Sequence, residues 1–177
     1  AHAENGAARF TTSVALDILG QPDPALVARA LSLPPEAIVS RVHPPTLATL
    51  GLPFTIVELT STEELSACQP DIPTLREACD RYRDGVDFSL FAYVRTGDTV
   101  HARMFAPLGG TYEDPATGSA CATLGALLTH LHDADQTLTV HQGADMGRPS
   151  VISVTTKGAA VTIAGQAKQV MMGTLIY

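Results

Sequence analysis

Glu113-Asp114-Pro115-Ala116-Thr117-Gly118-Ser119-Ala120 is the stretch that decides the fold, because an unusual segment grows out of it. From Thr117 the chain continues Gly-Ser-Ala-Cys-Ala-Thr-Leu-Gly-Ala-Leu-Leu-Thr-His-Leu, about four helical turns of small and apolar residues without a charge. A helix with no charged face has to be surrounded by other structure. The sequence therefore predicts a buried central helix over about residues 118–131.

Short alternating segments on both sides of this helix predict the structure that surrounds it. Downstream, strands are expected over residues 138–142, 151–156, 161–164 and 170–176. Upstream, strands are expected over 10–18, 54–59 and 86–95, the last forming a hairpin with 99–106. Helices are expected to start at Asp23-Pro24, Ser61 and Ile72-Pro73, which have capping residues or an early proline. The predicted fold class is α+β, with a mixed, mostly antiparallel sheet wrapped around the central helix.

Composition narrows the classes of function. The net charge is −7 with only 11 Lys and Arg residues, which leaves no basic surface for nucleic acid. No apolar run approaches the roughly 20 residues of a membrane span. Cys68, Cys79 and Cys121 are too few and too widely spaced for a disulfide scaffold or a zinc cluster. Reduced thiols of a cytoplasmic protein are the expected interpretation.

The helix start is the candidate site. A helix N-terminus has unpaired N–H groups and a partial positive charge, so the backbone of Gly118, Ser119 and Ala120 can hold a carboxylate. Ser119 adds a hydroxyl donor, and Asp114 can accept from an amine or hydroxyl of the same ligand. The plain alternative is that Asp114 only caps the helix and Ser119 is an ordinary helix-start residue. A nucleophilic serine is disfavoured, because no Gly-x-Ser-x-Gly turn surrounds it.

Two motifs carry a family resemblance. Arg103-Met-Phe-Ala-Pro-Leu-Gly-Gly-Thr-Tyr-Glu-Asp-Pro-Ala-Thr-Gly-Ser-Ala120 and Gln142-Gly-Ala-Asp-Met-Gly-Arg-Pro-Ser150 resemble, in order and spacing, the signatures of the phenazine-biosynthesis-type (PhzF-like) isomerases. The resemblance extends more faintly back to about Gln21. It implies a diaminopimelate-epimerase-like fold of two lobes, without cofactor or metal, in which a small carboxylate-bearing substrate similar to dihydro-hydroxyanthranilate lies between the lobes.

The resemblance also implies roles for individual residues. Asp114 is the implied catalytic residue, and Thr117, Gly118, Ser119 and Ala120 are the implied substrate-binding residues. In this family a glutamate of the first lobe moves the proton and a Gly-His-Pro motif there orients the substrate. Members tend to be homodimers.

The chain departs from the family pattern upstream of Gly51, where neither the Gly-His-Pro motif nor the first-lobe glutamate is found. We therefore expect residues 1–22 to be a remnant or exit strand of a first lobe and 23–177 to be the second lobe, in a processed or truncated product. This lobe would supply half of an active site and associate with a copy of itself or with the missing lobe. The alternative is a non-catalytic lobe that binds a small anion or self-associates.

Other candidate residues receive structural interpretations. Related epimerases use a cysteine at the position of Thr117, whereas Cys121 lies one turn inside the apolar helix, where a packing role is expected. The histidines show no metal-ligand spacing with a third ligand. Arg103 and Arg148 could steer a carboxylate, but ion pairs within the lobe are the expected role.

Overall fold

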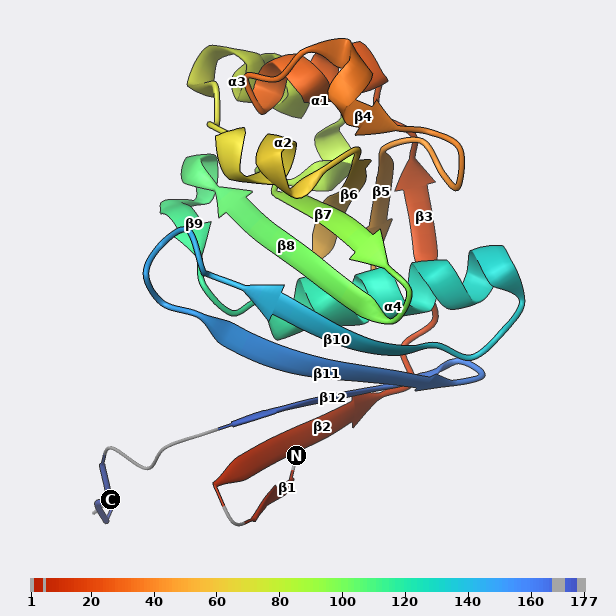
Figure 1. The fold of residues 1–177 in the computed structure, drawn as a ribbon, viewed down its shortest axis with the longest axis vertical. Coiled ribbons are helices and arrows are strands. Elements are labelled where there is room, and N and C mark those ends of the chain that lie inside the picture. The colour runs from red at the N-terminus through yellow and green to blue at the C-terminus, as the bar shows by residue number, and fades with distance from the viewer. Residues whose placement is uncertain (1, 5, 167–170, 175–177) are drawn as a thin grey trace.

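The computed structural model describes residues 2–4, 6–166 and 171–174, and one twisted sheet runs through this part of the chain (Figure 1). Its strands lie in the order β1-β2-β12-β11-β10-β8-β7-β6-β5-β3, with β4 added beside β6 and β9 beside β8. The strands are β1 (His2–Glu4), β2 (Ala7–Thr12), β3 (Asp17–Gly20), β4 (Ile38–Val39), β5 (Thr46–Thr49), β6 (Pro53–Leu59), β7 (Leu90–Thr96), β8 (Thr99–Ala106), β9 (Thr111–Asp114), β10 (Thr137–Gln142), β11 (Ser150–Lys157) and β12 (Ala160–Gln166).

The sheet is mixed, as predicted. Within the described residues, β6 pairs with β7 and β8 with β10 in parallel, and the remaining pairings are antiparallel. Two strands can pair in parallel only if the connection between them carries the chain back to the end of the sheet where the first strand began. Helices α2 (Thr62–Ala67) and α3 (Ile72–Arg81) lie in the first of these connections, and α4 (Gly118–His132) lies in the second.

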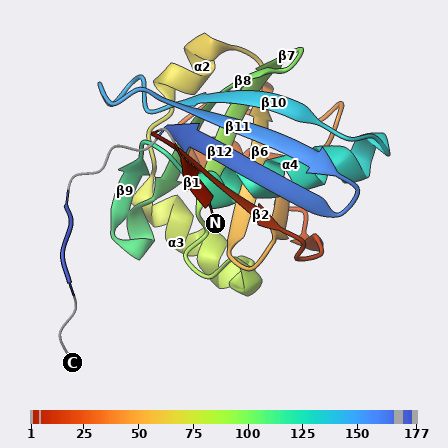
Figure 2. The same cartoon turned by 90° about the horizontal axis from the view of Figure 1, so that it is seen from below.

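Helix α4 lies on the concave side of the sheet, and β10, β11, β12 and β2 pass across it (Figures 1 and 2). Eight of its residues are buried, including Leu124, Leu127 and Leu128. They pack against inward-facing residues of the strands, such as Tyr93 and Val154. Because α4 is packed on several sides, a charged side chain on it would lose its hydration, which explains why the helix has no Asp, Glu, Lys or Arg.

A second core lies on the other face of β6, β7 and β8. There α1 (Pro24–Ala30), α2 and α3 pack on Val57, Leu90, Ala92 and Phe105. Short 3₁₀ turns lie at η1 (Pro35–Ala37), η2 (Arg83–Gly85) and η3 (Pro107–Gly109). None of the helices in the described part of the chain is both long and apolar enough to cross a membrane.

The predicted helix starts are confirmed at atomic level. Asp23 accepts from the Ala25 N–H at 3.0 Å, and Ser61 accepts from the Glu64 N–H at 3.2 Å. Helix α3 begins at Ile72 with Pro73 in its first turn. Each cap satisfies a donor that the helix itself leaves unpaired.

Three strand predictions are wrong in their extent. The predicted strand over 10–18 is two strands, because β2 pairs with β12 whereas β3 pairs with β5 at the opposite end of the sheet. The predicted strand over 86–95 begins only at Leu90, since Val86 and Phe88 have φ of 55° and 52°. Of the predicted strand over 170–176, residues 170, 175 and 176 lie outside the described residues. Residues 171–174 form no strand.

Candidate functional site

The first turn of α4 has backbone N–H groups without an internal acceptor, on the half-buried Gly118, the exposed Ser119 and the fully buried Ala120. Thr117 is the N-cap residue, with φ −104° and ψ 84°, and its side chain makes no hydrogen bond to the helix. Among the described residues, no acceptor faces the N–H groups of Gly118, Ser119 and Ala120. The next N–H, that of Cys121, donates to the Thr117 carbonyl at 3.0 Å. Because this end also carries the positive pole of the helix dipole, it suits an anion.

The Asp114 carboxylate lies beside these N–H groups and is held by two donors. Its Oδ2 accepts a hydrogen bond of 2.7 Å from the Thr117 hydroxyl, and its Oδ1 accepts one of 3.4 Å from the Ala116 N–H. A carboxylate has about four acceptor positions, so these two bonds leave capacity for a ligand. Asp114 is half-buried at the end of β9. The structure thus places it as a fixed acceptor next to the helix start.

Gln142 connects this site to β10. Its side chain is only 2% exposed, and its Oε1 accepts from the Thr117 N–H at 3.1 Å. Its Nε2 donates to Thr117 Oγ1 at 2.9 Å and to the Asp114 carbonyl. Gly143 follows with φ of 77°, and a Cβ there would lie 2.9 Å from the Pro115 carbonyl oxygen. Glycine therefore allows the two sequence motifs to pack as one unit.

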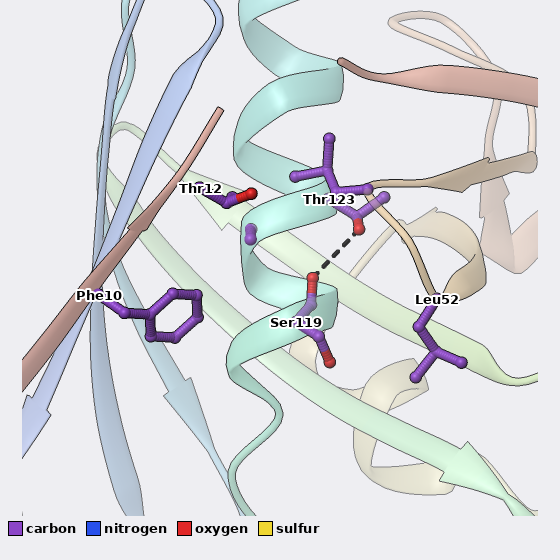
Figure 3. Close-up of a pocket in the computed structure, with 7 residues that line it drawn as sticks. Phe10, Thr12, Leu52, Ser119 and Thr123 are labelled. Carbon is purple, nitrogen blue, oxygen red and sulfur yellow. Dashed lines mark hydrogen bonds between the residues drawn. The ribbon is translucent and has the colours of Figure 1, made fainter. Parts of the chain in front are cut away.

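A half-open groove of about 120 Å³ runs along the first turns of α4 (Figure 3). Phe10 and Leu52 lie on opposite sides of the helix, and Ser119 and Thr123 lie between them. Thr123 donates its hydroxyl hydrogen to the Ser119 carbonyl at 3.1 Å, so this hydroxyl is already engaged. Of the predicted site residues, Ser119 lines this groove, whereas Asp114, Thr117, Gly118 and Ala120 do not. The groove thus offers apolar walls and the exposed Ser119.

Glu113, the other carboxylate of the motif, is engaged elsewhere. Arg103 donates from Nε and Nη2 to its two oxygens, each at 2.8 Å. Arg103 also donates from Nη1 to the carbonyls of Leu65, Ser66 and Cys68 at 3.1, 3.0 and 3.2 Å. Arg103 is therefore tied within the protein, as expected, and Glu113 is not available as an acid or base.

The thiols are poor candidates for a base. Cys121 is buried inside α4, and burial raises the pKa of its thiol well above its ordinary value. Burial likewise raises the pKa of Cys68 to about 12. At neutral pH both thiols are protonated, and thiolate is the reactive form.

The histidines are arranged in a way that sequence reasoning missed. His101 of β8 and His141 of β10 are register partners, and their rings stack with centroids 5.2 Å apart. His43 is buried and bonds through Nε2 to the Tyr93 hydroxyl at 2.8 Å. Within the described ranges, no group of three or more His, Cys, Asp or Glu is placed to hold a metal ion.

Comparison with known proteins places these features in context. A family model described as phenazine biosynthesis-like protein matches residues 15–173. An uncharacterized isomerase of Mesorhizobium japonicum is 32% identical over 167 residues, covering 86% of this chain and 55% of that protein. The trans-2,3-dihydro-3-hydroxyanthranilate isomerase of Pseudomonas fluorescens is 30% identical over 127 residues, covering 68% and 43%. The chain thus spans about half the length of these curated relatives.

Solved structures show the same fold. A predicted epimerase from Pseudomonas aeruginosa superposes with a TM-score of 0.71 at 26% identity, covering 94% of this chain and 59% of that one. A phenazine biosynthesis protein of the PhzF family from Bacillus anthracis also gives 0.71, at 18% identity, covering 93% and 59%.

Proposed function

Because the chain belongs to the phenazine biosynthesis-like protein family, we propose that it serves in an isomerase that moves a proton within a small carboxylate-bearing substrate. The observation that carries the proposal is the helix start, where three N–H groups without acceptors in the described structure lie beside the Asp114 carboxylate. In this proposal Thr117, Gly118, Ser119 and Ala120 form the substrate site. Asp114 accepts a hydrogen bond from the substrate.

The proposed substrate is a carboxylate that also carries an amine or hydroxyl, similar to dihydro-hydroxyanthranilate. A relative from Pseudomonas fluorescens is named for such an isomerisation. The carboxylate would bind the N–H groups of α4, whose fixed dipoles need no rearrangement to stabilise negative charge. An amine or hydroxyl would then reach Asp114. No cofactor is needed for this proton transfer.

We further propose that these residues form the second lobe of a diaminopimelate-epimerase-like enzyme, with α4 as its central helix. The carboxylate that moves the proton would lie on a facing lobe, outside these 177 residues. This proposal is supported by the engagement of Glu113 with Arg103 and by the share of each relative that the chain spans. A cytoplasmic homodimer is the proposed assembly.

A second candidate function is anion binding without catalysis. It is favoured by the two carboxylates at the site, because Glu113 is paired with Arg103 and Asp114 is held by Thr117 and Ala116. Neither has the apolar, unpartnered surroundings that usually turn a carboxylate into a general base at neutral pH. The same open helix start would then hold a small anion.

An NMR titration tests the site that both functions share. Inorganic phosphate and anthranilate, which combines a carboxylate with an amine, are added separately while backbone amide resonances are followed. We expect saturable shifts at Gly118, Ser119 and Ala120. Asp114→Asn should weaken anthranilate relative to phosphate. Anthranilate loses the acceptor of its amine, whereas phosphate has no amine and is no longer repelled by the carboxylate. Shifts centred elsewhere, with these three amides unmoved, would refute both functions.

A further inference from the structure

Thr117 behaves unusually for a threonine at the start of a helix. At the N-cap position, threonine normally accepts a hydrogen bond from the N–H two or three residues later. Here the hydroxyl makes no such bond, although Ser119 and Ala120 have N–H groups with no acceptor among the described residues. Instead it donates to Asp114 at 2.7 Å. Another group must therefore compete with the helix for this hydroxyl.

Gln142 is the group that competes. Its Nε2 donates to Thr117 Oγ1 at 2.9 Å, so a lone pair that could cap the helix is occupied. Its Oε1 accepts from the Thr117 N–H at 3.1 Å, which holds the backbone of the same residue. The Thr117 hydroxyl thus accepts a hydrogen bond from Gln142 and donates one to Asp114.

The orientation of the Gln142 amide is fixed by its partners. The Thr117 N–H can only donate, so it requires the amide oxygen. The Asp114 carbonyl can only accept, so it requires the amide nitrogen. If the amide were flipped, its NH₂ would face the Thr117 N–H and its oxygen would face the Asp114 carbonyl. Neither group would then have a hydrogen-bond partner. The side chain is also 2% exposed, so water does not offer an alternative.

We propose that Gln142 is a positioning residue that prevents Thr117 from capping its own helix. It thereby keeps the first N–H groups of α4, on the half-buried Gly118 and the exposed Ser119, available to a ligand. The functional meaning of this role rests on the function proposed above. The orientation of the Thr117 hydroxyl can be tested independently of that function. The role explains why a buried amide belongs to the second motif, at the end of β10.

The first test is the Thr117 side-chain conformation in Gln142→Met, which keeps the length and removes both hydrogen-bonding groups. A crystal structure of this variant should show Thr117 Oγ1 within hydrogen-bonding distance, about 3 Å, of the Ser119 or Ala120 nitrogen. Gln142→Asn, whose amide is one methylene shorter and cannot reach every partner, is the milder variant should Gln142→Met not fold. A hydroxyl that stays on Asp114 and away from the helix in the folded variant overturns the proposal.

The second test measures phosphate affinity from the three amide resonances. Gln142→Met should raise Kd about tenfold, since a self-capped helix no longer offers all of its donors. In a Thr117→Val background, which has no hydroxyl to turn inward, the same substitution should change Kd less than about twofold. An equal loss in both backgrounds would mean that Gln142 only stabilises the fold, and the proposal would be wrong. If the parent protein binds no phosphate, the proposed function fails, whereas the Thr117 conformation still decides the role of Gln142.

Discussion

Arg103 and Glu113 form a two-pronged ion pair in which Nε and Nη2 each lie 2.8 Å from one carboxylate oxygen, with side chains only 10% and 8% exposed. The guanidinium also lies over the Phe105 ring at 4.8 Å. Its third nitrogen donates to three carbonyls at the end of α2. The residue before Asp114 is thereby fastened to β8 and α2, which gives the candidate site a rigid support.

Removing one partner of this pair should destabilise the protein strongly. Glu113→Gln removes the two-pronged partner of a buried guanidinium and leaves it only Asp145, 3.8 Å away and partly exposed. Breaking a buried pair costs about 3–5 kcal/mol, and we expect a loss toward the lower end of that range. The matched control is Glu77→Gln, which breaks the Arg29–Glu77 pair. That pair is similarly short, at 2.7 Å, but more than half exposed. That change should cost less than about 1 kcal/mol. Urea unfolding measures both free energies, and similar losses for the two variants would contradict the structural account.

Gly125 should be intolerant of a side chain, unlike the glycine at the start of the same helix. A Cβ at Gly125 would lie 2.6 Å from Cγ1 of Val154, a buried and stiff side chain. A Cβ at Gly118 would meet Ile163 at 3.5 Å and Phe10 at 3.8 Å, which are ordinary contacts.

Alanine gains about 1 kcal/mol over glycine in a helix, whereas overpacking costs about 1–3 kcal/mol. Gly125→Ala should therefore lower the free energy of unfolding, and Gly118→Ala should leave it unchanged or raise it slightly. Thermal unfolding of both variants provides the measurement. A Gly125→Ala protein as stable as its parent would show that α4 is packed more loosely than described.

Stability should fall in mild acid because of His43. Its Nδ1 bonds to the Pro44 carbonyl and its Nε2 to Tyr93, and burial lowers the pKa of His43 below its ordinary 6.5. The unfolded chain thus takes up a proton near pH 6.5, while the folded protein resists it. Stability is complete above that pH and declines as the pH falls from 6.5 through the lower folded pKa.

Comparison with His43→Gln isolates this effect. The difference in unfolding free energy between parent and variant should shrink as the pH is lowered from 8 to 5. Burial raises the pKa of nearby Glu58, which acts in the opposite direction, but Glu58 is present in both proteins. The other charged groups that act on His43 or Glu58 are also the same in both proteins: His132, Arg41 and Arg95. A pH-independent difference would rule out a role for His43 titration.

Local sequence signals predicted the elements whose cause is local. The cap residues Asp23 and Ser61 bond within their own turns, and the uncharged run after Thr117 forms a buried helix of 15 residues. Strand extents failed where distant pairing decides them. Residues 10–18 alternate like one strand, yet their two halves pair with β12 and β5, which lie far apart in the sheet order.

The candidate site divides in the same way. Asp114 and the residues of the helix start are adjacent in sequence, so their chemistry could be predicted. The contact of Gln142 with Thr117 spans 25 residues, and the stacking of His101 on His141 depends on a parallel pairing that no local pattern reveals. Val86 and Phe88 favour strands by residue type, yet both have positive φ. Phe88 is buried in the second core, whereas Val86 is 70% exposed and follows the turn η2.

Asp114→Asn separates substrate binding from capping. Asparagine keeps an oxygen to accept from Thr117 or Ala116, so the helix start should persist and stability should change by less than about 1 kcal/mol. If Asp114 binds the substrate during proton transfer, turnover of a catalytically complete assembly should fall on the order of 10²-fold or more. Steady-state kinetics and unfolding curves are compared for the same preparations. Equal turnover would eliminate the catalytic role of Asp114.

The 177-residue chain by itself should not isomerise a substrate. Proton transfer requires a base within about 3 Å of the migrating hydrogen, or one water away. Near the helix start, Glu113 is paired with Arg103, and Asp114 accepts from Thr117 and Ala116. The Cys121 thiol is buried with a raised pKa, so it does not supply a thiolate. Among the described residues at the helix start, Glu113 and Cys121 are thus unavailable as a base. We expect Asp114 to accept a hydrogen bond from the substrate without removing a proton.

Hydrogen exchange in deuterated water tests this expectation. The purified chain is incubated with trans-2,3-dihydro-3-hydroxyanthranilate and with a panel of small amino and hydroxy acids, and deuterium at carbon is followed by mass spectrometry. We expect no incorporation above the uncatalysed rate, even where NMR shows the ligand at Gly118, Ser119 and Ala120. Binding without exchange would agree with a base on a facing lobe and also with anion binding without catalysis. Sustained exchange by the isolated chain would overturn this expectation. If that exchange disappears in Asp114→Asn while NMR still shows the ligand bound, Asp114 is the base.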